Sequence, residues 1–279
     1  MTDHYAVIGN PIAQSKSPLI HAAFAREMRQ DLDYVAILGP IGGFAERVDQ
    51  FRREGGRGLN VTVPFKLEAF AYATDLSGRA RAAGAVNALK FEGERVFAEN
   101  FDGVGFVRDI RENLGFPLRG KRILLLGAGG AARGVIAPFL AEKPACLVIA
   151  NRTPRNGAAL AHEFSRYGAV DSVEYAELER ALAFDLVVNT TSASLQGEAP
   201  PVPARSYAAG SLAYDLVYGK GLTPFLSAAK SAGAARLADG IGMLVEQAAE
   251  AFEWWRGVRP QTAPVIEALT VPLDSRPSA

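Results

Sequence analysis

An amide, a hydroxyl and an ammonium group lie close together in the segment NVTVPFK, residues 60–66. In a strand, side chains alternate between two faces, so Asn60 and Thr62 face one way and the apolar residues, the last of them Val63, face the other. Lys66 then follows at the carboxyl end of the strand, where open α/β sheets bind ligands. The segment therefore predicts a polar ligand site, although a strand with a polar outer face and a surface lysine has the same pattern.

A carboxylate follows in the segment NFDG, where Asp102 precedes the predicted helix Val104–Asn113. Aspartate is a preferred helix N-cap, and its carboxylate also suits an ammonium group such as that of Lys66. The sequence leaves both roles open. The second role predicts that the two side chains meet.

The segment SKSP predicts the start of a helix, with Ser17 as its N-cap and Pro18 as its first residue. The free N–H groups of that first turn, with the hydroxyls of Ser15 and Ser17, form a site for a carboxylate. The alternative is that these hydroxyls only cap the helix. We interpret His21, on the same helix, as structural.

A glycine-rich loop follows the apolar strand signal KRILLL of residues 121–126 and precedes a helical pattern. Gly127 permits a tight turn, Gly129 lets the backbone approach a pyrophosphate, and Ala132, in place of a third glycine, lets helix and strand pack closely. The helix N-terminus supplies free N–H groups and the positive end of its dipole to the anion. The loop predicts a bound dinucleotide; the alternative is an ordinary tight turn.

The end of the next strand favours NADP over NAD. An NAD enzyme usually places an acid there to bind the ribose 2′-hydroxyl. Here the strand ends in Asn151-Arg152-Thr153, without an acid. An arginine at this point suits a 2′-phosphate through charge-assisted hydrogen bonds, unless Arg152 is only a solvated surface residue.

Composition excludes several classes of function. Basic and acidic residues number 30 each, so the surplus of positive charge that a general nucleic-acid binder needs is missing. We expect no membrane helix, no signal peptide and no metal site, since the sequence shows none of their patterns. The single cysteine, Cys146, is expected to be a buried strand residue, and a reducing cytoplasm is the expected compartment.

Short apolar runs alternate with helical patterns, which predicts crossover connections and mostly parallel sheets. A turn at Gly93 predicts one antiparallel hairpin. The expected strands are Tyr5–Ile8, Tyr34–Leu38, Gly58–Val63, Val86–Phe91, Arg95–Ala98, Ile123–Leu126, Cys146–Ala150, Leu186–Asn189 and Leu212–Leu216, and clear helical patterns cover Phe44–Arg53, Gly130–Leu140 and Ile241–Trp255.

The expected fold is α/β with two domains. An N-terminal mixed-sheet α/β substrate domain covers residues 1–101 plus 239–279, and a Rossmann-type doubly wound NADP domain covers residues 102–238. The last long helix, with Trp254 and Trp255, is expected to pack back on the first domain.

The motifs taken together resemble the shikimate dehydrogenase family. SKSPLIH, NVTVPFK, GAVN, NFDGVG, GAGGAARG, NRT, YDLVYGKGLTPF and DGIGMLVEQAAEAF occur in the family's order and span nearly the whole chain. The resemblance implies NADPH-dependent reduction of 3-dehydroshikimate to shikimate, and the reverse. It also implies a first domain closed by the C-terminal helices, with the cofactor between the domains.

The resemblance also implies roles for individual residues. Lys66 and Asp102 match the catalytic pair that handles the proton. The residues that match substrate ligands are Ser15, Ser17, Asn60, Thr62, Asn87, Tyr218 and Gln247. The residues that match the cofactor site are Gly127, Ala128, Gly129, Gly130, Ala131, Asn151, Arg152, Thr153 and Gly240.

Three positions depart from the family pattern. Phe101 and Ala88 stand where the family usually has threonines, and we expect both changes to remove hydroxyls near the substrate. Arg155 lies one position earlier than the second arginine of the usual NADP motif, so a contact with the phosphate is left open.

Two other functions compete with the first reading. One is a quinate/shikimate dehydrogenase that prefers NAD, which Arg152 argues against. The other is a non-catalytic module that senses NADP or shikimate, which would be expected to lose Lys66 or Asp102. The expected partner is the small-molecule substrate. The chain is expected to be a monomer or a homodimer.

Overall fold

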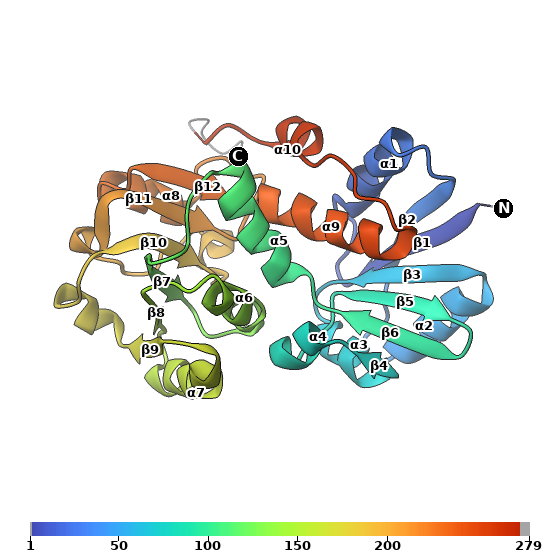
Figure 1. Cartoon of the computed structure of the whole chain (residues 1–279), viewed down its shortest axis with the longest axis horizontal. Helices are drawn as coiled ribbons and strands as arrows, with labels where there is room; N and C mark the ends of the chain where they lie inside the picture. The colour runs from blue at the N-terminus through green and yellow to red at the C-terminus, as the bar shows by residue number, and fades with distance from the viewer. Residues whose placement is uncertain (1, 274–279) are drawn as a thin grey trace. The chain divides into compact units, whose positions relative to one another are not determined.

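The computed structural model describes residues 2–273, in which the chain forms two compact units, each with its own sheet (Figure 1). The first unit comprises Met1–Gly105 and Leu244–Val265, and the second comprises Phe106–Met243 and Ile266–Ala279. The sequence assigned residues 239–279 to the first domain. Of these, residues 239–243 and 266–273 group instead with the second unit, because Asp239 ends a strand of its sheet and Leu273 packs against its core.

The first unit contains a mixed sheet with the strand order β2-β1-β3-β5-β6-β4. The first three strands along the chain are mutually parallel, whereas β5 is antiparallel to both β3 and β6, so the predicted hairpin is confirmed. The strands are β1 (Asp3–Gly9), β2 (Leu32–Leu38), β3 (Gly56–Val61), β4 (Asp75–Leu76), β5 (Ala88–Glu92) and β6 (Arg95–Glu99).

Helices cover both faces of this sheet. They are α1 (Ser17–Glu27), α2 (Phe44–Arg53), α3 (Lys66–Tyr72) and α4 (Gly78–Ala83), with most of α9 (Ile241–Arg256) and the start of α5 (Asp102–Arg108). Phe44 of α2 and Ala69 of α3 pack with Leu59 on one face. On the other face, the indole of Trp255 stacks on Tyr5 with 4.7 Å between ring centroids, which confirms that the last long helix packs on this unit.

The second unit contains a six-stranded, all-parallel sheet with the order β12-β11-β10-β7-β8-β9. Its strands are β7 (Arg122–Leu126), β8 (Cys146–Ala150), β9 (Val170–Val173), β10 (Phe184–Asn189), β11 (Tyr207–Asp215) and β12 (Arg236–Asp239). The order reverses between β7 and β10, which is the doubly wound arrangement with its ligand-binding switch point. The expected Rossmann-type sheet is therefore confirmed.

Further helices complete the chain: α6 (Gly130–Ala141), α7 (Pro154–Phe164) and α8 (Pro224–Ser231), with α10 (Ala263–Leu269) at the end of the described residues. A π-helical turn covers Asp109–Asn113, and short 3₁₀ turns cover Ser165–Tyr167, Tyr175–Glu179, Ala193–Gln196 and Ala204–Ser206. Phe106, Phe139 and Tyr214 meet edge to face in the core beside the sheet. Each such buried aromatic ring contributes roughly 1.5–3 kcal/mol by leaving water.

Some predicted boundaries were wrong. The strand expected to run to Val63 ends at Val61, and Val63 is 67% exposed instead of facing the core with Leu59. The chain turns there, because the N–H of Phe65 bonds to the carbonyl of Thr62 at 3.0 Å and the Phe65 ring is buried. The short strands β4, β9 and β12 were missed.

Other expectations need smaller corrections. Helix α1 begins at Ser17, so Lys16 takes the N-cap position and the Ser17 side chain does not cap the helix. Cys146 lies in β8 as expected but is only half-buried, because its strand begins at that residue. Within residues 2–273, no helix has the length and apolar character needed to cross a membrane.

Candidate active site

Lys66 is the first residue of α3, directly after the turn that follows β3. The buried Phe65 ring holds this turn in the core, and the carbonyl of Lys66 accepts the N–H of Val86 at 3.0 Å. The backbone is therefore fixed from two sides. The side chain of Lys66 extends away from the sheet and keeps 30% of its surface exposed, enough for solvent to reach the ammonium group.

Asp102 is the first residue of α5. Its backbone N–H donates to Oδ1 of Asn100 at 3.1 Å, and the amide of Asn100 donates in turn to the carbonyl of Ala85 at 3.0 Å. Asn100 is buried, so it ties the start of α5 to the loop before β5. Sequence reasoning quoted Asn100 within the motif but gave it no role; its bond to the N–H two residues further on is typical of an Asx turn before a helix.

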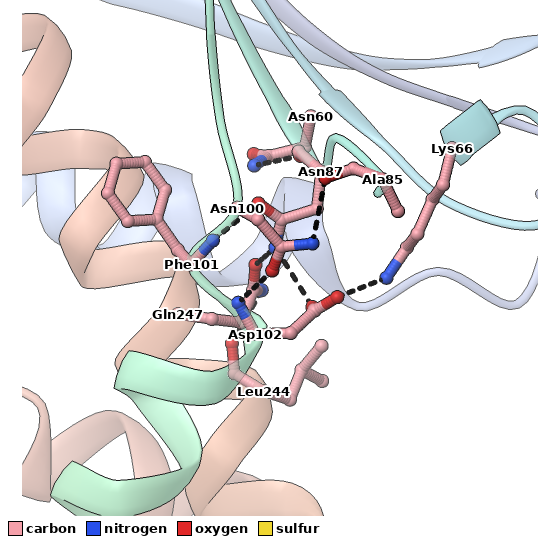
Figure 2. Close-up of polar contacts among 9 residues, drawn as sticks. All are labelled: Asn60, Lys66, Ala85, Asn87, Asn100, Phe101, Asp102, Leu244 and Gln247. Atoms are coloured by element: carbon pink, nitrogen blue, oxygen red, sulfur yellow. Dashed lines mark hydrogen bonds and ion pairs between the residues drawn. The ribbon is translucent and has the colours of Figure 1, made fainter. Parts of the chain in front are cut away.

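The two side chains meet. Nζ of Lys66 lies 2.5 Å from Oδ2 of Asp102, as Figure 2 shows. Asp102 retains 18% exposure of its side chain, so the pair lies at the border of solvent and interior. This confirms the predicted meeting of lysine and aspartate. A donor held at this distance by a carboxylate is poised to give a proton to an oxygen placed beside it.

Asn87 holds the other oxygen of this carboxylate. Its Nδ2 donates to Oδ1 of Asp102 at 2.9 Å and to Oε1 of Gln247 at 3.2 Å, while its Oδ1 accepts the N–H of Phe101 at 2.8 Å. Each polar hydrogen of this buried amide thus has a protein partner (Figure 2). We call Lys66, Asn87, Asp102 and Gln247 the Asn87 network.

Gln247 reaches the network from α9. A Cβ on Gly105 would lie 2.5 Å from the backbone nitrogen of Gln247, so only glycine lets α5 approach α9 this closely. The Nε2 of Gln247 also donates to the carbonyl of Leu244 at 2.8 Å. Asn87 and Gln247, which are 160 positions apart in the chain, are therefore bonded directly to each other.

The remaining predicted substrate residues of this unit lie near the starts and ends of its strands and helices. Asn60, in β3, accepts the hydroxyl of Tyr34 and donates to the carbonyl of Asn87. Thr62 follows β3 and is half-buried. Ser15 accepts the N–H of Ser17 at 3.3 Å at the start of α1. The structure thus bonds Asn60 to the backbone of the Asn87 network, whereas no hydrogen bond or ion pair joins Ser15 or Thr62 to it among the described residues.

The glycine loop of the second unit fits a dinucleotide. Gly127 has φ +106°, a conformation that favours glycine, and a Cβ there would lie 2.9 Å from the hydroxyl of Thr190. At Gly129 and Gly130 a Cβ would meet nothing within 4 Å, so the backbone is open. Helix α6 begins at Gly130 with no side-chain cap, and its free N–H groups can take a pyrophosphate. Ala128 is half-buried and Ala131 is exposed, beside the buried Ala132 that packs against the sheet.

The turn that follows the end of β8 carries an exposed arginine, Arg152. The amide of Asn151 donates to the carbonyl of Thr153 at 2.9 Å and so closes the turn. Arg152 is exposed and forms no ion pair within residues 2–273. Burial raises the pKa of the Tyr175 hydroxyl, and the nearby charge of Arg152 partly offsets that rise. Arg155 is also exposed. These residues can hold a phosphate without breaking an existing ion pair.

The other two predicted residues of this unit are Tyr218 and Gly240. Tyr218 is half-buried after β11, and burial raises the pKa of its hydroxyl. Gly240 is buried, and a Cβ there would lie 2.4 Å from the carbonyl oxygen of Leu216. A close backbone approach therefore accounts for this glycine. Across residues 2–273 no group of three His, Cys, Asp or Glu is placed to hold a metal ion.

Known families and relatives match nearly the whole chain. Residues 7–89 match the model of the shikimate dehydrogenase substrate binding domain, residues 110–196 that of shikimate / quinate 5-dehydrogenase, and residues 240–270 that of the shikimate 5′-dehydrogenase C-terminal domain. A curated relative from Nitrosospira multiformis, named shikimate dehydrogenase (NADP(+)), is 59% identical over 99% of this chain and all of its own. The chain belongs to the shikimate dehydrogenase family.

Solved structures agree with this membership. An Ael1 enzyme from Pseudomonas putida is 57% identical, with a TM-score of 0.94 over 98% of this chain and 100% of its own. Shikimate 5-dehydrogenase from Thermus thermophilus, in complex with NADP(H) and shikimate, is 34% identical, with a TM-score of 0.84 over 96% of this chain and 98% of its own.

Two of the three departures from the family pattern, Phe101 and Ala88, lie in the core. Phe101 is 2% exposed and packs its ring against Trp254, with 5.7 Å between centroids, and under the guanidinium of Arg79. Ala88 is fully buried in the same cluster. Figure 2 shows the Phe101 ring directed away from Lys66. Both side chains are therefore part of the packed core, and the loss of hydroxyls beside the substrate stays a prediction, because the expected substrate residues Asn60 and Asn87 are buried as well.

Sequence reasoning missed two carboxylates in the second unit. Asp215 is fully buried at the end of β11 and Asp239 is buried at the end of β12, directly opposite in the strand register. Burial raises the pKa of both carboxyl groups. Four groups donate to Asp215, namely the side chains of Asn189, Ser194 and Thr223 and the N–H of Val217.

Asp239 accepts the N–H groups of Gly219 and Ile241, at 3.0 and 3.2 Å. The two carboxylates thus fix both ends of the segment that carries Tyr218. An acid at the end of each of two strands, YD and AD, was the signal in the sequence that could have identified them.

Proposed function

We propose that this chain is an NADP-dependent dehydrogenase that interconverts shikimate and 3-dehydroshikimate. The observation that carries the proposal is the 2.5 Å contact between Nζ of Lys66 and Oδ2 of Asp102, inside a set of buried amides. Family membership and the names of the curated relatives, NADP(+)-dependent shikimate dehydrogenases, support the same activity.

When bound, NADPH supplies the hydride that reduces the substrate ketone, and NADP⁺ accepts one in reverse. The ketone oxygen then needs a proton. We infer that Nζ of Lys66 donates it, while Asp102 keeps the ammonium group in line and Asn87 keeps the carboxylate in place. Lys66 regains its proton from solvent through its exposed surface. In the direction of shikimate oxidation, the neutral amine takes the hydroxyl proton.

The remaining residues bind and orient the two small molecules. The open backbone at Gly129 and Gly130 suits the pyrophosphate, and Arg152 suits a 2′-phosphate. The hydroxyls of Ser15 and Ser17 suit the substrate carboxylate, and the amides of Asn60 and Gln247 suit its hydroxyls. With a cation and no acid at the end of β8, the NAD-preferring alternative has no support from these residues.

One absorbance assay tests the proposal. Purified protein is mixed with shikimate and NADP, and formation of the reduced nicotinamide is followed. In Lys66→Met, which keeps the side-chain length but has no ammonium group, we expect kcat to fall by about 10²–10⁴ with a modest change in KM for shikimate. The matched control is Lys90→Met, because Lys90 is 31% exposed and is also paired with a carboxylate, Glu92 at 2.7 Å.

Wild-type protein that binds NADP and shikimate without turnover would favour the sensing module instead. Equal activity in Lys66→Met and wild type would remove the lysine from the mechanism and leave the rest of the proposal standing.

A further inference from the structure

Tyr34 is a buried tyrosine that sequence reasoning gave no role. It lies in β2, at the edge of the first sheet, and only 8% of its surface is exposed. Its hydroxyl donates to Oδ1 of Asn60 at 2.7 Å. Because β1 lies between the strands of these two residues, the tyrosine side chain crosses over β1 to reach the amide.

A second contact fixes the same amide. Nδ2 of Asn60 donates to the carbonyl of Asn87 at 3.3 Å. The carbonyl of Asn87 can only accept, so it sets the orientation of the amide, and the hydroxyl of Tyr34 then donates to the amide oxygen. One N–H of the amide is then left without a partner in these contacts. Asn60 therefore keeps one N–H that can still donate, although the same amide also interacts with the imidazole of His21.

The ring of Tyr34 cannot move out of this position without disrupting a packed cluster. The imidazole of His21 stacks on it with centroids 4.1 Å apart and the rings 6° from parallel. Phe252 and Trp255 of α9 also pack against the imidazole, with ring centroids 6.1 and 5.6 Å from it. Packing therefore holds the hydroxyl of Tyr34 at a constant place relative to Asn60.

Both aromatic groups stay neutral at physiological pH. Burial lowers the pKa of His21 to about 3, so the imidazole brings no charge near the amide. Burial raises the pKa of Tyr34 well above its usual value, so its hydroxyl keeps the hydrogen that it donates. The Ser17 hydroxyl interacts with the same tyrosine hydroxyl and partly offsets that rise. Tyr34 thus connects two residues expected to hold substrate.

We propose that Tyr34 is a positioning residue of the substrate site, which fixes the Asn60 amide so that the site selects a substrate oxygen able to accept a hydrogen bond. The inference deepens the proposed function and rests on it, because Asn60 is taken to face a ring hydroxyl of shikimate.

The test uses Tyr34→Phe in the full-length enzyme, which keeps the stacked ring and removes only the hydroxyl. Without that donor the amide keeps only its contact with the carbonyl of Asn87 and is held less firmly. We expect KM for shikimate to rise about tenfold, the equivalent of one hydrogen bond, while KM for NADP stays the same. A variant that only lost stability would not change KM for shikimate while leaving KM for NADP unchanged.

The matched control is Tyr5→Phe. Tyr5 is buried in the same sheet and stacks on Trp255, but its hydroxyl has only a long contact, 3.5 Å, with Arg256. We expect its KM for shikimate to equal that of the wild type. A second control is the double variant Tyr34→Phe with Asn60→Ala, which should be no worse than Asn60→Ala alone, because the tyrosine acts through the amide.

The inference would be overturned if Tyr34→Phe raised KM for shikimate further in a protein that already carries Asn60→Ala. It would also be overturned if Tyr34→Phe alone left this KM unchanged. The side-chain amide signals of Asn60 in NMR spectra give a readout that does not need activity. They should shift in Tyr34→Phe and stay in place in Tyr5→Phe. Wild-type protein without shikimate turnover would refute the proposed function, and the amide signals would still decide whether Tyr34 fixes Asn60.

Discussion

Replacing Asp102 by asparagine is the most direct test of how the Asn87 network works. In the wild type, both partners of the carboxylate are donors: Nζ of Lys66 at 2.5 Å and Nδ2 of Asn87 at 2.9 Å. An amide of the same shape has only one oxygen. Whichever way it turns, its NH₂ group must face a donor, so one of the two contacts is lost.

The size of the effect follows from that contact. A hydrogen bond to a charged group is worth about 1.5–3 kcal/mol, or about 10- to 100-fold in rate if it is needed in the transition state. Solvent screens this pair, because Lys66 is 30% exposed. We therefore expect kcat of Asp102→Asn to fall by about 10- to 30-fold, less than for Lys66→Met, since a lysine that is poorly held can still donate.

Initial rates at saturating NADP and shikimate measure this change. Asp75→Asn is the matched control, because Asp75 is 2.5 Å from Arg95 in the same unit but on an exposed surface, and it should retain the wild-type kcat. A wild-type kcat in Asp102→Asn would refute the reasoning. A loss as large as that of Lys66→Met would show instead that the carboxylate itself takes part in the chemistry.

Two further outcomes are expected. Burial lowers the pKa of His21 to about 3 in the folded chain, whereas a free imidazole has a pKa of 6.5, so the unfolded state binds more protons between these values. Stability is then complete above pH 6.5 and falls as the pH drops towards 3, by about 2 kcal/mol between pH 7 and pH 5. Urea unfolding of His21→Phe should lose this part of the pH dependence, and an unchanged slope would contradict the buried neutral imidazole. For Arg152→Ala, NADP should bind about 10- to 100-fold more weakly while NAD binding changes little, because one charge-assisted contact is lost; calorimetry that finds equal losses for both cofactors would rule out a 2′-phosphate contact.

The sequence predicted the parts of the site that depend on local pattern. The doubly wound sheet followed from alternating strand and helix signals, and the glycine loop from the spacing of Gly127 and Gly129 after a strand. The pairing of Lys66 with Asp102 was predicted from the resemblance of the motifs to those of the family. The local residue pattern alone was equally compatible with a lysine on the surface.

The rest depends on contacts between residues distant in the chain. Asn87 reaches Gln247 because α5 and α9 approach each other closely at Gly105. The hydrophobic periodicity of the sequence does not reveal this approach. Tyr34 reaches Asn60 across an intervening strand. The end of β3 was misplaced because alternation continues through Val63 in the sequence, although the chain has already turned. Short strands such as β9 carry too few residues to show a period.

The paired carboxylates of the second unit bear on protein engineering. Asp215 and Asp239 end neighbouring strands opposite one another, and burial of the two acids is unfavourable, as their raised pKa values indicate. Neutralising either acid would nevertheless leave buried donors without their acceptor and would release the backbone at Gly219 or Val217. Libraries built on this scaffold should therefore leave both acids unchanged.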